Sequence, residues 1–195
     1  MITSLDQLDL TKQYSYADYL AWQFEERVEL IKGYIFPVAV PARRHQQISW
    51  NVFGMFWKRL KDASCKVYVA PFDVRLPRIP TPDNKKMMTV LQPDLCVICD
   101  LARLDDQGCG GAPDLVVEIL SQGNTEKEMK QKFDAYQDAG IQEYWLIQTE
   151  DRNVSQYVLN NEGIYTGLHL LTDEDELVSR VFPDLRIDLA GVFAD

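Results

Sequence analysis

The sequence predicts an α/β fold in which helices flank a central mixed sheet. The apolar run Leu115–Leu120, interrupted only by Glu118, is typical of a strand that is covered on both faces. A helical pattern over residues 125–139 follows it, and a second buried strand follows at Tyr144–Ile147. The alternation of strands and helices over the whole chain predicts the mixed α/β class.

The N-terminal part is expected to form a helix and a hairpin. Ser15 begins a Ser-x-x-Asp pattern that is typical of a helix start, and Tyr19, Leu20, Gln23 and Phe24 follow it at helical spacing. The segments Val28–Ile31 and Tyr34–Val38 predict an N-terminal hairpin, with Gly33 supplying the positive φ of a tight turn.

A second helix is expected between Ala42 and Lys61, because its apolar residues form one stripe of an amphipathic helix. Extended segments follow at Val67–Leu76 and at Val90–Cys99, the latter predicted as one strand. The capping box that Thr125 begins predicts the start of the third helix, and Gly140 predicts its end. The last predicted elements are the strands Val154–Leu159 and Ile164–Leu170, joined as a hairpin.

Length and composition favour a single domain over residues 1–195. Apolar residues make up 46% of the 195 residues, which is too many for a disordered chain. No apolar run approaches the length of a membrane-spanning helix, and the first 20 residues lack the basic start and apolar stretch of a secretion signal. We therefore expect a cytoplasmic protein whose four cysteines, Cys65, Cys96, Cys99 and Cys109, are thiols.

The charge distribution leaves room for a polyanionic partner although the net charge is −10. Residues 42–86 contain ten basic residues and three acidic ones, whereas residues 136–195 contain three basic and twelve acidic residues. One basic sector can therefore meet nucleic acid. The alternative is an ordinary solvated surface.

Glu118 and Lys132 are the two charged residues at positions that the pattern predicts to be buried. An unpaired carboxylate at Glu118 would cost many kcal/mol, so it is expected to be protonated, paired or bound to a metal. Lys132 lies on the apolar face of the third helix and either extends outward to solvent or pairs with a buried anion. Glu118 is the expected anion, and Glu128, one turn back, is an alternative.

Asp94 begins a strand directly after Pro93, and Asp114 follows Pro113 in the same way. We interpret Asp114 as a turn residue and Asp94 as a candidate for the site, with turn capping as the alternative for Asp94. An Asp, a Glu and a Lys that converge in an apolar α/β core are typical of a metal-dependent phosphodiesterase site.

Several sequence blocks occur in an order that resembles a known family. They are Arg27–Ile35, Arg44–Gln46, Ala70–Pro77, Gln92–Asp94, Gly111–Ser121, Gln131–Tyr136 and Gly140–Trp145. Together, over roughly residues 15–190, they closely resemble the Uma family of bacterial restriction endonucleases in the PD-(D/E)xK nuclease superfamily. No single block is specific to this family, but the ordered set of blocks is.

The resemblance implies a restriction-endonuclease-like core with flanking helices and an N-terminal hairpin. It also implies a divalent-metal-dependent nuclease that uses Mg²⁺ or Mn²⁺ and hydrolyses nucleic acid, with DNA as the expected substrate. It implies that Asp94 and Glu118 hold the metal and that Lys132 assists the attacking water, with Glu29 completing the acidic cluster. Asp73 is a weaker candidate. It also implies a homodimer.

The sequence departs from the superfamily pattern at the lysine, which is expected two residues after the second acid. That position is Leu120 here, and Lys132 on the following helix takes its place. The sequence also departs from the family pattern at Gln122, where the family usually has a proline, and at Gln148, where it often has an acidic residue. The alternative function is a catalytically inactive binding or assembly module.

Residues outside the acidic set have weaker interpretations. His45 can hold a phosphate or water, or simply pack. Cys96 and Cys99 are predicted on opposite faces of their strand, which favours core packing over a metal site. Trp50, Phe53 and Trp57 can stack on bases, although core or dimer contacts are favoured. The candidate phosphate contacts are Arg43, Arg44, His45, Arg75, Arg78, Lys85 and Lys86.

Overall fold

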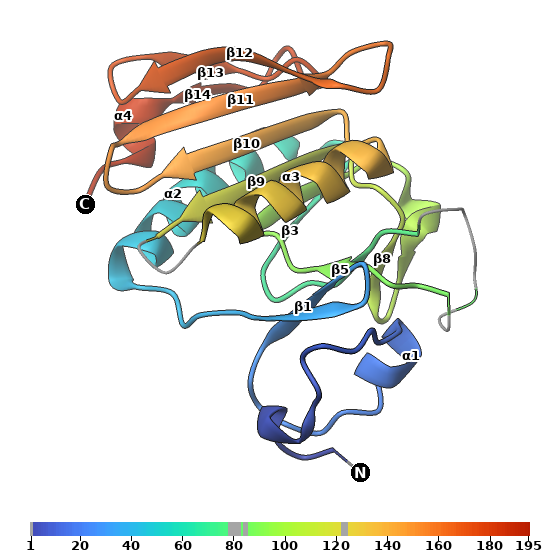
Figure 1. Cartoon of the computed structure of the whole chain (residues 1–195). Helices are drawn as coiled ribbons and strands as arrows, with labels where there is room; N and C mark the ends of the chain where they lie inside the picture. Colours follow the sequence, from blue (N-terminus) through green and yellow to red (C-terminus); the bar gives the residue numbers. More distant parts are fainter. Residues whose placement is uncertain (1, 78–82, 84–85, 122–124) are drawn as a thin grey trace.

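The computed structural model describes residues 2–77, 83, 86–121 and 125–195 of the chain. It contains two six-stranded sheets and one two-stranded sheet (Figure 1). The helices are η1 (Leu5–Gln7), α1 (Tyr16–Tyr19), α2 (Arg43–Leu60), η2 (Leu101–Arg103), α3 (Glu126–Ala139) and α4 (Leu189–Val192). The first strands are β1 (Val28–Ile31), β2 (Tyr34–Pro37), β3 (Lys66–Val69), β4 (Val74–Arg75), β5 (Val90–Leu91), β6 (Leu95–Ile98) and β7 (Leu104–Asp105). The remaining strands are β8 (Gly108–Gly110), β9 (Leu115–Leu120), β10 (Glu143–Gln148), β11 (Asn153–Leu159), β12 (Tyr165–Thr172), β13 (Glu176–Val178) and β14 (Arg186–Asp188).

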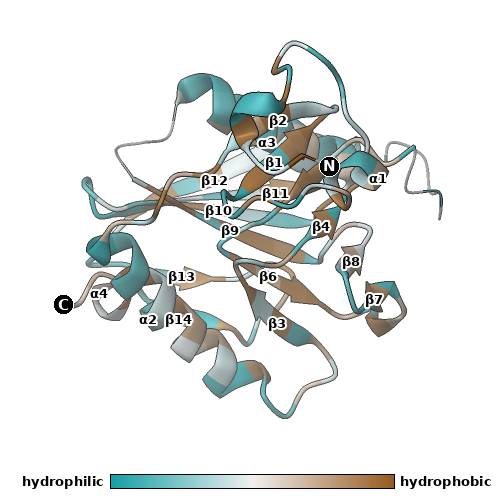
Figure 2. Cartoon of the chain, turned by 90° about the horizontal axis from the view of Figure 1, so that it is seen from below, coloured by the Kyte–Doolittle hydropathy of each residue, from teal (hydrophilic) through white to brown (hydrophobic). Residues whose placement is uncertain are grey.

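The main sheet has the strand order β12-β11-β10-β9-β6-β3 and is mixed, which confirms the predicted α/β class. Strands β9 and β10 run parallel, and the other neighbours run antiparallel. Helices α2 and α3 cover opposite faces of this sheet (Figures 1 and 2). The side chains of β9 alternate between them, because Val117 packs in the cluster of α2 and Val116 packs in the cluster of α3.

The helix ends follow the sequence signals. The Thr125 hydroxyl accepts a hydrogen bond from the backbone N–H of Glu128 at the start of α3, and Gly140 ends the helix with φ of 80°. The Ser15–Asp18 capping box is present, but α1 ends at Tyr19 instead of continuing to Phe24 as the spacing suggested. In the described part of the chain, no helix is long and apolar enough to cross a membrane.

The second sheet has the order β2-β1-β5-β4-β8-β7 and contains the predicted hairpin β1–β2. The extended segments predicted over residues 67–76 and 90–99 form one long hairpin whose two halves belong to different sheets. Strands β3 and β6 pair in the main sheet, while β4 and β5 pair in the second sheet. The prediction of a single strand over Val90–Cys99 is therefore wrong. Pro71 and Pro93 lie at the change of sheet, where a residue without a backbone N–H cannot continue a ladder.

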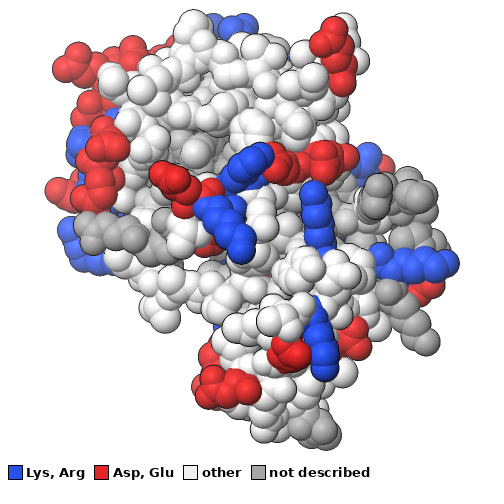
Figure 3. Space-filling model, in the orientation of Figure 1, with Lys and Arg blue, Asp and Glu red and all other residues white. Residues whose placement is uncertain are grey.

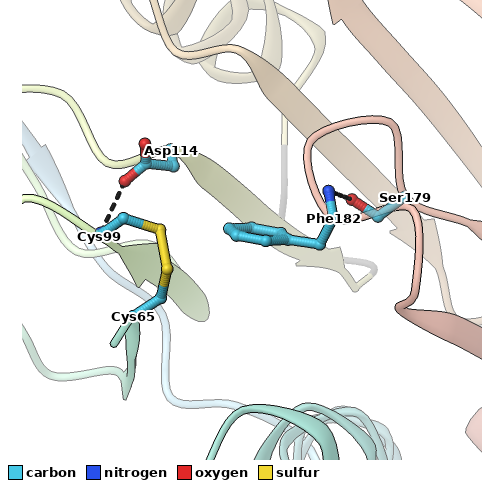
Figure 4. Close-up of a disulfide and its surroundings, with 5 residues drawn as sticks. All are labelled: Cys65, Cys99, Asp114, Ser179 and Phe182. Atoms are coloured by element: carbon cyan, nitrogen blue, oxygen red, sulfur yellow. Dashed lines mark hydrogen bonds between the residues drawn. A yellow bond between two sulfur atoms is a disulfide. The ribbon is translucent and has the colours of Figure 1, made fainter. Parts of the chain in front are cut away.

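The prediction that all four cysteines are thiols is wrong for one pair. Cys65 and Cys99 form a disulfide that joins the segment after α2 to the end of β6 (Figure 4). The Asp114 side chain accepts a hydrogen bond from the Cys99 backbone N–H, which agrees with its interpretation as a turn residue. Cys96 and Cys109 are free and buried, so Cys96 packs in the core as expected.

Removing this cross-link is expected to lower the thermal stability. The disulfide spans 34 residues, and closing a loop of that length stabilises a fold by about 3–4 kcal/mol through the entropy of the unfolded chain. A Cys65→Ser, Cys99→Ser variant is expected to melt several degrees below the wild type in calorimetry without reductant. In dithiothreitol the two proteins should melt together. Equal melting temperatures without reductant would contradict the disulfide.

Candidate active site

A cavity of about 280 Å³ lies where the two large sheets meet, and we call it the acidic pocket. Its charged or ionisable lining residues are Arg27, Glu29, His45, Asp94, Glu118, Glu128 and Lys132. These residues come from β1, α2, β9, α3 and the segments before β1 and β6. Four carboxylates face two cations there, so the pocket is negative while His45 is neutral.

The register of the main sheet brings Asp94 and Glu118 together. Leu95 pairs with Val117 in the antiparallel ladder of β6 and β9, so the next position places Asp94 opposite Glu118. Directly opposed residues have Cβ atoms roughly 5 Å apart. The Asp94 Oδ2 atom also accepts a hydrogen bond of 2.7 Å from the Ile119 backbone N–H. That bond fixes the Oδ2 atom, and the other carboxylate oxygen, Oδ1, contacts His45.

Lys132 joins the carboxylates of both sheets. Its Nζ atom lies 3.1 Å from Glu118 Oε1 and 2.9 Å from Glu29 Oε2. The predicted partner Glu118 is therefore correct, and Glu29 is a second one. The Tyr136 hydroxyl donates a further hydrogen bond to Glu118 Oε1 from one turn along α3. All four residues are buried, so charged groups from β1, β9 and α3 meet in one buried cluster.

Burial and neighbouring charges shift the pKa values of these groups. Burial raises the pKa of Glu118 to about 7, although the Lys132 ammonium opposes this shift. For Lys132, burial lowers the pKa, but the charges of Glu118 and Glu29 outweigh it and raise the pKa overall. Burial, with the charge of Glu118, raises the pKa of Tyr136 well above its usual value. A carboxyl group that binds a proton near neutral pH can exchange that proton for a metal ion.

His45 lies at the start of α2 and contacts Asp94. Its Nε2 atom is 3.2 Å from Asp94 Oδ1, and the side chain is 11% exposed. Burial lowers the pKa of His45, but the hydrogen bond to Asp94 and the charge of Asp94 raise it overall. The imidazole is therefore positioned on a carboxylate of the site, whereas the sequence suggested a phosphate or water contact or simple packing.

Gln92 is a positioning residue that the sequence analysis missed. Its backbone N–H donates to Glu29 Oε1 at 2.7 Å, which orients this carboxylate toward Lys132. Its side-chain amide donates to Asp73 and accepts from Arg27. Asp73 itself is bound by tyrosine hydroxyls and does not line the acidic pocket, so its place is structural. In the sequence, the block Gln92-Pro93-Asp94 indicated only Asp94 as a candidate site residue.

Tyr136 was also missed as part of the site. It follows Lys132 by four residues on the same face of α3, so helical spacing alone could have found it.

The predicted phosphate contacts do not gather in one place. Arg75 is buried, pairs with Asp105 and lines a second cavity. Arg44 holds the C-terminal segment through Asp195 and the Phe193 carbonyl oxygen. Arg43 is exposed, pairs with Asp195 and does not line the acidic pocket, and Lys86 is exposed and lines a third cavity. Arg78 and Lys85, like the departure at Gln122, lie outside the described residues.

The donor set of the acidic pocket fits a hard divalent cation. Asp94 and Glu118 supply carboxylate oxygens, and Mg²⁺ is commonly held by one or two carboxylates together with several waters. Among the described residues, no group of three or more His, Cys, Asp or Glu side chains is spaced to hold a metal ion by itself. The pocket therefore fits a cation that keeps water or substrate ligands, and it does not fit a closed structural site.

Comparison with known proteins gives a family match and several similar chains. The family model Uma2, described as "Putative restriction endonuclease", matches residues 16–190. The uncharacterized protein sll1609 of Synechocystis sp. is 28% identical over 152 residues, which cover 75% of this chain and 81% of that protein. The crystal structure of a "putative nuclease belonging to DUF820" from Anabaena variabilis has a TM-score of 0.72 at 16% identity. The match covers 92% of this chain and 97% of that one, and it shows a shared fold.

Proposed function

Because the chain belongs to the Uma2 family, we propose that it is a divalent-metal-dependent endonuclease that hydrolyses phosphodiester bonds in DNA. The observation that carries the proposal is the meeting of Glu29, Asp94, Glu118 and Lys132 in the acidic pocket. The burial of Glu29, Glu118 and Lys132 costs free energy that a purely structural role does not require, because apolar residues of similar volume are often at least as stable.

Each side chain has a role that its position supports. Asp94 and Glu118 would hold Mg²⁺ or Mn²⁺, which polarises the phosphate and provides hydroxide near neutral pH when bound. Lys132, whose ammonium contacts Glu118, would orient the attacking water and stabilise negative charge that develops on the phosphate oxygens. Glu29 and Tyr136 hold Lys132 and Glu118 in position. His45 holds Asp94 from the other side.

A cleavage assay tests the reaction directly. Linear and circular DNA, both single- and double-stranded, are incubated with the protein at low salt in Mg²⁺ or Mn²⁺. We expect cleavage that stops in excess EDTA and returns when the metal is restored. If every DNA form stays intact with both metals over a wide range of protein concentrations, the nuclease assignment is wrong.

Metal binding is expected to depend on Asp94. Isothermal titration with Mn²⁺ should give one site in the wild type, and Asp94→Asn should weaken it by at least about a hundredfold because a ligand is lost. The matched control is Asp114→Asn, whose carboxylate caps a turn at the other end of β9. Equal affinities in Asp94→Asn and the wild type would place the metal elsewhere.

The closed ion pair of Lys132 with Glu118 also suits the second candidate, an inactive binding module. In that case the titration shows no metal site and the ion pair is structural. The homodimer and the cytoplasmic location remain predictions, which sedimentation and cell fractionation would test.

A further inference from the structure

Helix α2 exposes aromatic rings at the mouth of the acidic pocket. Trp50 is 71% exposed and Trp57 is 54% exposed, although large aromatic side chains are usually buried. Phe53 lies between them, with ring centroids 6.3 Å from Trp50 and 6.2 Å from Trp57. We call these three residues the aromatic strip. They are spaced by three and four residues, so they form one continuous ridge on the helix surface.

The aromatic strip is continuous with the acidic pocket. Trp50 and Phe53 line the same cavity as Asp94 and Glu118, and Trp57 extends the ridge by one turn away from it. If a nucleic-acid strand places one phosphate at the acidic pocket, its neighbouring nucleotides would therefore lie over the rings of the aromatic strip.

The charge of α2 indicates which kind of polymer fits the aromatic strip. The helix contains four cationic residues and no acidic residue, although the whole protein has a net charge of −10. Arg43 and Arg44 pair with Asp195, and Arg59 pairs with Asp184, although the Arg43 side chain is still 78% exposed. Among the described residues Lys58 makes no ion pair. Over α4 and the ends of the C-terminal strands, at the left edge of Figure 3, acidic side chains lie among several basic ones.

We propose that the aromatic strip is a base-stacking platform and that the substrate of the acidic pocket is DNA with unpaired bases. Exposed aromatic rings beside cations are the two features that single-stranded binding needs, since rings stack on bases and cations meet phosphates. Bases inside a duplex are stacked on each other and cannot reach these rings. The choice of DNA rests on the proposed function, whereas the strip does not.

Binding without cleavage tests the platform. A fluorescein-labelled oligodeoxythymidylate is titrated in EDTA against the wild type, Trp50→Ala, Trp57→Ala and the double variant. Stacking is worth about 1–3 kcal/mol per base, so each substitution should weaken binding by about 5-fold or more. The matched control is Tyr34→Ala, since Tyr34 is an exposed aromatic residue outside the pocket. Circular dichroism checks that α2 remains folded.

Three further probes identify what the strip binds. An abasic oligomer of equal length should bind weakly and equally to all variants, and a DNA duplex should bind more weakly than the single strand. Stacking should also quench tryptophan fluorescence, and the double variant should lose that quenching. Equal binding of the thymidylate to the wild type and the double variant would overturn the proposal, as would a preference for the duplex or for RNA of matched sequence.

Other outcomes separate this proposal from its rivals. If the wild type sediments as a dimer that the double variant loses while DNA binding is unchanged, the strip binds a second copy and the proposal is wrong. If the strip binds DNA as described but no cleavage occurs, the nuclease assignment fails and the platform stands. If cleavage occurs and the tryptophan variants bind and cleave like the wild type, the platform fails and the nuclease stands.

Discussion

Glu118→Gln is expected to lower the rate of DNA cleavage by about 10²–10³-fold, since a lost electrostatic contact to the reacting groups costs roughly 3–4 kcal/mol in the transition state. The substitution keeps the size of the side chain and can keep the contact with Tyr136. Lys132 retains Glu29 as a partner, so the fold should persist. The measurement is the single-turnover rate in Mg²⁺ and in Mn²⁺ at saturating protein.

The matched control for this variant is Asp134→Asn. Asp134 is a carboxylate on α3 that pairs with Lys130 at the surface, and it does not line the acidic pocket. This variant should cleave DNA at the wild-type rate. A Glu118→Gln protein that cleaves within a few-fold of the wild type would show that the acidic pocket is not the catalytic site.

Glu143→Ala is expected to lower the free energy of unfolding by about 3–5 kcal/mol, because it leaves several buried hydrogen-bond donors without an acceptor. Glu143 is fully buried on β10 and accepts five hydrogen bonds of 2.7–2.9 Å. The donors are Trp145 Nε1, Gln156 Nε2, Ser179 Oγ and the backbone N–H groups of Arg180 and Val181. Urea denaturation followed by circular dichroism measures the change.

The control for the second variant is Glu176→Ala, which removes an exposed carboxylate paired with Arg186 on the two-stranded sheet. An exposed pair of this kind contributes about 1 kcal/mol or less. A Glu143→Ala protein that is as stable as this control would show that the buried carboxylate does not anchor the C-terminal segment. Cleavage is not the readout here, since Glu143 lies outside the acidic pocket.

The parts of the site that depend on local periodicity could be predicted from the sequence. A lysine among the apolar residues of α3, following a carboxylate in an apolar strand, already indicated the pair Lys132–Glu118. The assignment of Glu29 needed the family resemblance, because nothing in the β1 sequence shows that it meets α3. Tyr136 could have been added by the same helical spacing that singled out Lys132.

Features that depend on distant contacts could not be predicted. The change of sheet within the long hairpin leaves the apolar pattern unbroken, so residues 90–99 look like one strand. The Cys65–Cys99 bond joins residues 34 apart, and strand alternation gives only the face on which each thiol lies. Three of the donors to Glu143 come from residues 179–181, which no local pattern connects to β10.

The long hairpin formed by β3, β4, β5 and β6 has a consequence for how this architecture can change in length. Asp94 lies where this hairpin passes from the second sheet to the main sheet. This passage sets the position of Glu29 on β1 relative to Glu118 on β9. Inserting or deleting one residue between Val69 and Val74 would reverse the inward and outward alternation on one side of the junction. Insertions and deletions should therefore be found only in segments away from this junction. We expect this even though none of residues 71–74 lines the acidic pocket.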